Sequence, residues 1–207
     1  RRITQEQAAA HRIAAIVQSL CVEESMSAID HKQLASALLP AVLAAGAIEM
    51  RHYRAGVTVE TKADESPVTI ADREAEAVLV AAIANAAPGI PIVAEEAVAA
   101  GRIPALGDEF FLVDPLDGTR EFIAQRDEFT VNVALIRNGA PAFGIVYAPA
   151  CGELYLTLAN DAAAMAKVAP REEHISMGDI ALQPIRVRAP DPAALIALVS
   201  RSHDTPE

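Results

Sequence analysis

The stretch "DPLDGTREF", residues 114 to 122, contains two carboxylates that lie three residues apart, Asp114 and Asp117. It directly follows the apolar run "EFFLV", which is typical of a buried strand. Asp-Pro and Asp-Gly are common turn dipeptides because Pro presets φ and Gly accepts a positive φ, so an ordinary turn is one interpretation. The other is that the turn directs two carboxylates and a backbone carbonyl at one metal-sized point. The stretch alone leaves both interpretations open.

Two further acidic positions stand at the ends of expected elements. Asp72 follows "SPVTIA" and lies in the first turn of a strong helical pattern that ends before Gly89. Glu95 and Glu96 end the short apolar run "IPIVAEE", which we expect to be a strand. Each position has an ordinary explanation, since Asp commonly caps a helix and acids at a strand end are commonly solvated.

Considered together, these carboxylates indicate a metal site. The ends of helices and strands can converge on one rim of a layered domain, where crowded carboxylates would raise each other's pKa. A hard divalent cation removes that conflict, and all-oxygen ligands favour magnesium over zinc. Metal ions in such a site can polarise a phosphoryl oxygen, activate water and stabilise the leaving oxygen. The sequence has no sulfur-rich zinc motif, glycine-rich phosphate loop or "GxSxG" elbow, so metal-assisted phosphate hydrolysis is the chemistry it favours.

The elements that must position these residues follow a helix–helix–strand–strand–meander order. Residues 31–54 and the segment after Asp72 read as helices, and residues 129–160 read as three antiparallel strands. This order predicts an α/β layered sandwich, with two helices on a mostly antiparallel sheet in residues 31–165.

The remaining segments are expected to lie outside this unit. Residues 1–30 are expected to form an N-terminal helical extension, with a helix over residues 4–20. Residues 160–180 lack a clear period and are expected to be a loop or a poorly defined helix. Residues 180–207 read as the start of a second, incomplete α/β unit.

Composition excludes several classes of partner. The formal net charge of −11 argues against a nucleic-acid backbone or an anionic membrane surface, because both need a basic protein face. An anionic substrate would need an added cation. The two cysteines lie far apart in sequence, which favours a reduced compartment over a disulfide framework. No uninterrupted apolar run approaches the roughly 18 residues of a membrane span, so we expect a soluble, cytoplasmic protein without a transmembrane segment.

Three quoted motifs also carry a family resemblance. In their order and spacing, "SPVTIAD", "VAEE" and "DPLDGTREF" resemble the lithium-sensitive, magnesium-dependent phosphatase superfamily of inositol monophosphatases. The longer stretch "DPLDGTREFIAQRDEFTVNVALI", followed by "GIVYAP", is most similar to the 3'(2'),5'-bisphosphate nucleotidases of that superfamily. The resemblance covers about residues 31–207 and implies the inositol-monophosphatase-like fold.

The resemblance implies a role for each matched residue. It implies four metal ligands, which are Glu95, Asp114, Asp117 and the backbone carbonyl of Leu116. It implies that Asp72 and Thr119 act in catalysis by orienting the attacking water. Gly118 and Thr119 match positions that offer backbone N–H groups to the phosphate. Ser200 and His203 match positions that hold the adenosine part of the substrate. Two or three Mg²⁺ ions are implied for the complete enzyme.

One departure from the family pattern concerns the last metal ligand. The family takes it from a Trp-Asp motif well downstream, and this chain has no tryptophan. The resemblance therefore implies that sequence beyond Glu207 would complete the site.

The implied activity is removal of the 3'-phosphate from adenosine 3',5'-bisphosphate, and possible action on its sulfated precursor would link the enzyme to sulfur assimilation. The substrate is then a small nucleotide phosphate and not a nucleic acid, and a homodimer is compatible with the resemblance. Two alternatives stay open. One is an inositol or sugar monophosphatase, and the other is a truncated, catalytically silent metal- or nucleotide-binding protein.

Overall fold

The structure, a computed structural model, describes residues 30–56, 59–61, 67–160, 162–187 and 189. The helix predicted over residues 4–20 and the rest of the expected N-terminal extension up to residue 29 lie outside the described residues. The same is true of Ser200 and His203.

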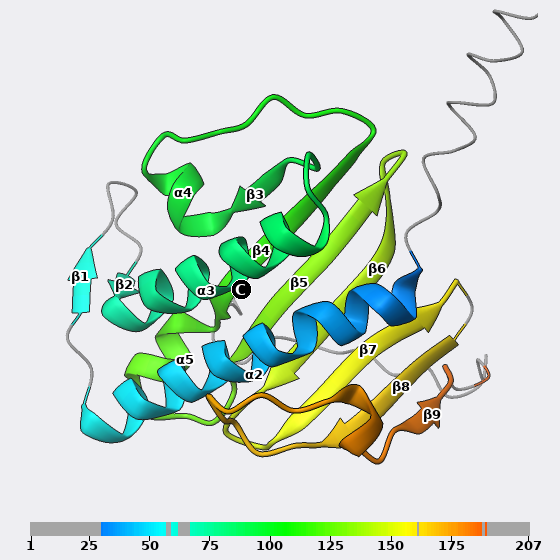
Figure 1. Ribbon diagram of the computed structural model, residues 1–207. Coiled ribbons are helices and arrows are strands. Elements are labelled where there is room, and N and C mark those ends of the chain that lie inside the picture. The colour runs from blue at the N-terminus through cyan, green and yellow to red at the C-terminus, as the bar shows by residue number, and fades with distance from the viewer. Residues whose placement is uncertain (1–29, 57–58, 62–66, 161, 188, 190–207) are drawn as a thin grey trace, which may run out of the picture.

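A seven-stranded sheet forms the centre of the fold, in the spatial order β3-β4-β5-β6-β7-β8-β9 (Figure 1). Neighbouring strands are antiparallel except for β3 and β4, which are parallel. The strands are β3 (Ile92–Ala94), β4 (Glu109–Asp117), β5 (Thr130–Arg137), β6 (Ala140–Ala148), β7 (Glu153–Ala159), β8 (Ala162–Lys167) and β9 (Gln183–Ile185). The predicted mostly antiparallel sheet is therefore confirmed.

Two long helices, α2 (His31–Ala55) and α3 (Ile70–Ala86), pack together over one face of this sheet (Figure 1). The short elements are α4 (Glu95–Ala99), α5 (Thr119–Ile123), the 3₁₀ turn η1 (Met177–Asp179) and a two-stranded ribbon of β1 (Val59–Thr61) and β2 (Pro67–Thr69). The helix-on-sheet layering matches the predicted α/β sandwich.

Helix α2 begins at a side-chain cap and continues through a proline. The Asp30 carboxylate accepts hydrogen bonds from the backbone N–H groups of Lys32 (2.8 Å) and Gln33 (3.3 Å), which would otherwise lack partners. Pro40 lies inside the helix. By length and hydropathy alone α2 could cross a membrane, but 61% of its most apolar window is buried within this fold. We interpret α2 as a core helix.

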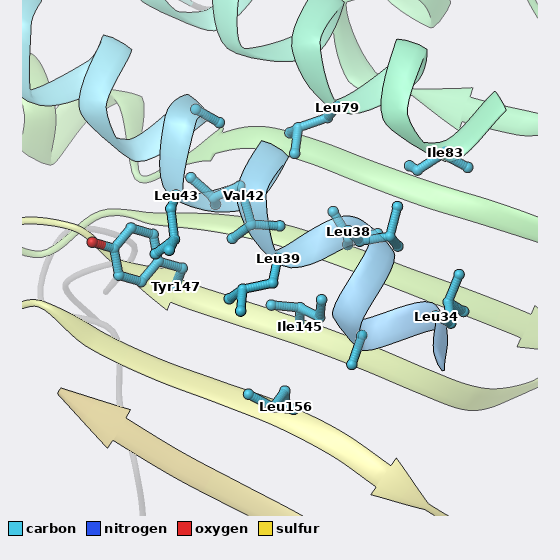
Figure 2. Close-up of a cluster of buried hydrophobic side chains, with 14 of the residues drawn as sticks. Leu34, Leu38, Leu39, Val42, Leu43, Leu79, Ile83, Ile145, Tyr147 and Leu156 are labelled. Atoms are coloured by element: carbon cyan, nitrogen blue, oxygen red, sulfur yellow. The ribbon is translucent and has the colours of Figure 1, made fainter. Parts of the chain in front are cut away.

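The main apolar core lies between the two helices and the sheet (Figure 2). Leucines of α2 at helical spacing, together with Leu79 and Ile83 of α3, pack over strand residues such as Ile145, Tyr147 and Leu156. A second, smaller cluster lies next to the loops that follow β4, and it consists of Met50, Ala71, Leu116, Phe122 and Phe129.

The expectation of a loop or poorly defined helix for residues 160–180 was wrong for residues 162–167. It was right for residues 168–180, which are loop and the 3₁₀ turn η1. Residues 162–167 form β8, which pairs antiparallel with β7. The segment "AAAMAK" is rich in alanine, which is depleted in strands, so intrinsic preference gives no strand signal. Pairing and the burial of Ala164 and Ala166 decide its conformation instead. Strand β9 extends the same sheet, and the part of the expected second α/β unit from residue 190 onward lies outside the described residues.

Candidate active site

The acidic residues gather where the parallel strands β3 and β4 end. The pairing of Ala94 with Val113 brings Glu95, the first residue of α4, beside Asp114. Glu95 thus starts a helix directly after its strand. The carboxyl end of parallel strands is a common place for a ligand site. Here β3 leaves the sheet after Ala94, whereas β4 continues beside β5 to Asp117.

A bulge in β4 places Asp114 and Asp117 on the same face of the sheet. Asp114 pairs with Asn132, whereas Asp117 pairs with Thr130, so three steps along β4 match two steps along β5. Without the extra residue, side chains three apart would point to opposite faces. The neighbours of Asn132 on β5 belong to the core beneath the helices, so both carboxylates face away from α2 and α3. Asn132 Nδ2 donates to Asp117 Oδ2 at 3.0 Å.

Gly118 lets the chain turn from β4 into α5. Its backbone is left-handed, with φ 96° and ψ 36°. A Cβ atom at this position would lie 2.7 Å from the carbonyl oxygen of Glu128, which is closer than real Cβ contacts. Both the dihedral angles and the close approach therefore require glycine between Asp117 and Thr119.

Replacing Gly118 with Ala is expected to lower the free energy of unfolding by at least about 2 kcal/mol, because left-handed strain and a backbone clash add together. Gly139→Ala is the matched control, since Gly139 also has a positive φ of 75° but open space around it. We expect a smaller loss there, about 1 kcal/mol, from strain alone. Urea unfolding measures both. Equal losses would mean that the approach to Glu128 places no constraint on this turn.

Asp72 is both a helix cap and a member of the acidic site. Asp72 occupies position N3 of α3 and forms a capping box with the N-cap residue Thr69. Its Oδ2 accepts hydrogen bonds from the backbone N–H of Thr69 (2.8 Å) and from the Thr69 hydroxyl (2.6 Å). Its other oxygen, Oδ1, lies 3.5 Å from the hydroxyl of Thr119. The side chain is fully buried. The two interpretations drawn from the sequence are therefore compatible, because each concerns a different oxygen.

The Thr119 hydroxyl connects Asp72 to the turn after β4. Its oxygen lies 3.1 Å from the carbonyl oxygen of Leu116 and 3.5 Å from Asp72 Oδ1, so its single hydrogen has two possible acceptors. The backbone N–H of Leu116 donates to Asp114 Oδ1 at 3.2 Å. These contacts place Asp72, Thr119 and Asp114 in one continuous polar network.

Crowding of carboxyl groups dominates the electrostatics of the site. Burial raises the pKa of Asp114 to about 8, and the negative charges of Glu95 and Asp117 and a hydrogen bond with Glu95 add to this effect. Asp114 therefore keeps its proton at neutral pH when no cation is present. A divalent cation can replace that proton as the positive charge.

The side chains partly fit such a cation. Within the part of the chain that the structure describes, no three Asp, Glu, His or Cys side chains are arranged to hold a metal ion as they stand. Glu95 and Asp114 are in contact, whereas the Asp117 carboxylate turns to Asn132. The predicted convergence of all three in one coordination sphere is thus not formed. All these donors are oxygens on one side of the sheet, which suits Mg²⁺ better than Zn²⁺.

Sequence reasoning missed three polar residues of this region. Glu76 on α3 accepts a 2.6 Å hydrogen bond from the backbone N–H of Glu96 and so fixes the start of α4. Asn132 binds Asp117 from the next strand. Glu49 is a fully buried carboxyl of α2 close to Asp72 and Asp114. The available signals were a Glu four residues after Asp72, a polar residue inside "TVNVAL" and a Glu within an apolar helix.

A hollow of about 410 Å³ adjoins the acidic residues on the face of the sheet opposite α2 and α3. Glu95, Asp114 and Asn132 border it, and the rest of its wall is mainly apolar. Leu112 and Val146 on this face are each 41% exposed. The site therefore adjoins a sheet face that is partly exposed to solvent, with Val98 of α4 at the border of the hollow.

Comparison with known proteins agrees with the fold and with the motifs. The profile of the inositol monophosphatase family matches residues 30–205. The 3'(2'),5'-bisphosphate nucleotidase CysQ of Shigella flexneri is 46% identical over 97 residues, which are 47% of this chain and 39% of that protein. The corresponding CysQ of Escherichia coli K12 is 44% identical over the same length. The chain thus spans about two fifths of the length of these relatives.

Solved structures give the same result at the level of the fold. CysQ from Bacteroides thetaiotaomicron is 34% identical with a TM-score of 0.61, covering 84% of this chain and 65% of that one. An inositol monophosphatase from Thermotoga maritima is 31% identical with a TM-score of 0.53, covering 60% of this chain and 48% of that one. Because the family profile spans nearly all the described residues, the chain belongs to the inositol monophosphatase family.

Proposed function

We propose that the protein is a magnesium-dependent phosphohydrolase that removes the 3'-phosphate from adenosine 3',5'-bisphosphate. The substrate is inferred from the similarity to proteins described as 3'(2'),5'-bisphosphate nucleotidases. One observation of the structure carries the chemistry, namely the contact between Glu95 and Asp114 at the ends of two parallel strands. Two carboxyl groups held together in this way need a proton or a cation, and a cation beside an anionic phosphate serves catalysis.

Glu95 and Asp114 would hold the first cation directly. Asp117 already lies on the same face, and a rotation of its side chain away from Asn132 would bring a third carboxylate toward Glu95 and Asp114. The Leu116 carbonyl is the fourth proposed donor. When bound, divalent cations would polarise the phosphoryl group and neutralise charge that develops on the leaving oxygen. The turn after β4 holds these donors in place through the Leu116 N–H to Asp114 contact and the rigid geometry at Gly118.

Asp72 and Thr119 would orient the attacking water. When the Thr119 hydroxyl donates its hydrogen to Asp72 or to the Leu116 carbonyl, its lone pairs stay available to accept a hydrogen bond from water. The Asp72 carboxylate lies close enough to the Thr119 hydroxyl to attract a cation and to accept a proton from the oriented water. The backbone N–H groups of Gly118 and Thr119 are proposed to contact the phosphate.

The adenosine end of the substrate is proposed to bind near Ser200 and His203. Action on the sulfated precursor of adenosine 3',5'-bisphosphate, a role in sulfur metabolism, a cytoplasmic location and assembly as a homodimer remain predictions. A small-molecule partner agrees with the net charge of −11, which disfavours nucleic acid.

The test compares phosphate release from adenosine 3',5'-bisphosphate and from inositol 1-phosphate by the whole protein, with Mg²⁺ and with EDTA. We expect Mg²⁺-dependent turnover and a higher kcat/KM for the nucleotide. Faster release from inositol 1-phosphate would instead favour an inositol monophosphatase, for which the likeness to the Thermotoga maritima structure provides a reason. If neither substrate released phosphate in a Mg²⁺-dependent way, the proposed function would be wrong.

A further inference from the structure

Glu49 is a buried carboxyl that the proposed mechanism does not use. It lies on the core side of α2 and has no solvent exposure. Neither Oε1 nor Oε2 has a hydrogen-bond partner among the described residues. A buried polar group that lacks a partner lowers the stability of a fold, and a buried charge lowers it more. An apolar side chain would suit this helix face better, so retention of a carboxyl needs a reason.

The position of Glu49 relative to the two apolar clusters places it beside the acidic site. Along α2, residues up to Ala45 belong to the larger cluster, and Met50 belongs to the smaller one. Helix α3 changes from the smaller to the larger cluster between Ala71 and Ala75, and β4 changes between Val113 and Leu116. These boundaries contain the carboxyl groups of Glu49, Asp72 and Asp114. The α3 boundary also contains Glu74, which pairs instead with Arg51 and His52.

The backbone of α2 cannot move Glu49 away from this boundary. Gly46, one turn earlier, packs so closely on the Tyr147 ring that an added Cβ would lie 2.5 Å from Tyr147 Cε1. That ring is itself fixed, since its hydroxyl donates to the Val168 carbonyl at 2.9 Å. The same hydrogen bond uses the only proton that Tyr147 could donate to a neighbouring carboxylate.

Electrostatics agrees with the placement. Burial raises the pKa of Glu49 well above its usual value, and the charges of Asp72 and Asp114 raise it further. Glu49 therefore lies within electrostatic range of one proposed catalytic carboxylate and one proposed cation ligand. A cation at the site would therefore stabilise the ionised carboxylates of Glu49, Asp72 and Asp114.

We propose that Glu49 is a positioning residue of the cation site, whose unpartnered carboxyl supports the bound cation from the core side, through Asp72 and Asp114. The inference rests on the proposed function, because it needs a divalent cation at Asp114. It extends the site beyond the strand ends to the C-terminal half of α2. Its consequence is that cation affinity depends on a residue that contacts neither solvent nor substrate.

The experiment measures Mg²⁺ affinity by titration calorimetry, and unfolding temperature with and without Mg²⁺, on the whole protein. The variants are Glu49→Gln, which keeps size and polarity, and Glu49→Met, which suits the apolar surroundings. Glu153→Gln is the charge-matched control, because Glu153 is a strand residue that pairs with Lys167 at 2.6 Å outside the site. We expect both Glu49 variants to bind Mg²⁺ about 10–100-fold more weakly, as for other residues that support metal ligands. The control should keep its affinity.

Stability separates this role from a packing role. Without Mg²⁺ we expect both variants to unfold at or above the temperature of the unaltered protein, because a buried unpartnered carboxyl has been removed. With Mg²⁺ we expect a smaller rise in that temperature than in the unaltered protein. If one variant does not fold, the other gives the same comparison. Unchanged Mg²⁺ affinity in a folded variant, beside Mg²⁺-dependent turnover in the unaltered protein, would overturn this inference alone. No Mg²⁺ binding by the unaltered protein would overturn the proposed function as well.

Discussion

Replacing Asp72 with Asn is expected to lower kcat for phosphate release by about 10²–10⁴-fold, the usual contribution of general-base assistance. Asn keeps the size of the side chain and can still accept from Thr69. It removes the negative charge near the Thr119 hydroxyl, which lies 3.5 Å from Oδ1. Steady-state kinetics under saturating Mg²⁺ measures the loss. The KM for adenosine 3',5'-bisphosphate should change less, because the adenosine end is proposed to bind elsewhere.

The capping role of Asp72 needs its own control. Thr69→Val removes the hydroxyl that takes part in the capping box and leaves the Asp72 carboxylate in place. Loss of a helix cap typically lowers the free energy of unfolding by about 0.5–2 kcal/mol. We expect a stability loss of that order from Thr69→Val with a much smaller effect on kcat than from Asp72→Asn. Near-normal turnover by Asp72→Asn would show that Asp72 is only a helix cap.

The sequence allowed the layered fold to be predicted, and it showed which acidic residues stand at the ends of its elements, because these signals are local. Helical spacing in residues 31–54 and after Asp72 determines two amphipathic helices, and Asn138-Gly139 marks the turn between β5 and β6. The pair Asp114 and Asp117 is visible because a turn motif follows an apolar strand. Local patterns of this kind persist in the structure, since packing reinforces them.

The parts that could not be predicted depend on contacts between distant segments. The bulge that turns Asp114 and Asp117 to one face is defined only by the pairing of β4 with β5. The strand at residues 162–167 is defined by β7, because alanine has little preference for strands. Glu49 belongs to the site through the packing of α2 on Tyr147 and α3, about which a single Glu in an apolar helix gives no information.

Replacing Asp114 with Asn is expected to affect stability and activity in opposite directions. In the unaltered protein without a cation, the pKa of Asp114 is raised to about 8, first by burial and then by Glu95 and Asp117. The unfolded chain releases this proton near pH 4, whereas the folded chain keeps it until about pH 8. Stability from this group is therefore complete below about pH 4 and decreases as the pH rises to about 8. The slope is at most about 1.4 kcal/mol per pH unit, and partial exposure to solvent reduces it.

The Asn variant has no such proton, so its cation-free stability should depend less on pH and exceed that of the unaltered protein at pH 8. Urea unfolding in EDTA at pH 5 and pH 8 measures this difference. With Mg²⁺ the order should reverse, because the cation stabilises only a protein that binds it. Turnover by the Asn variant should fall by about 10²–10³-fold, as when other electrostatic contacts to a transition state are removed. Asp108→Asn is the control, since Asp108 is exposed and pairs with Asn138 through its backbone. If Asp114→Asn kept both Mg²⁺ stabilisation and turnover, the carboxyl pair at the strand ends would not be the cation site.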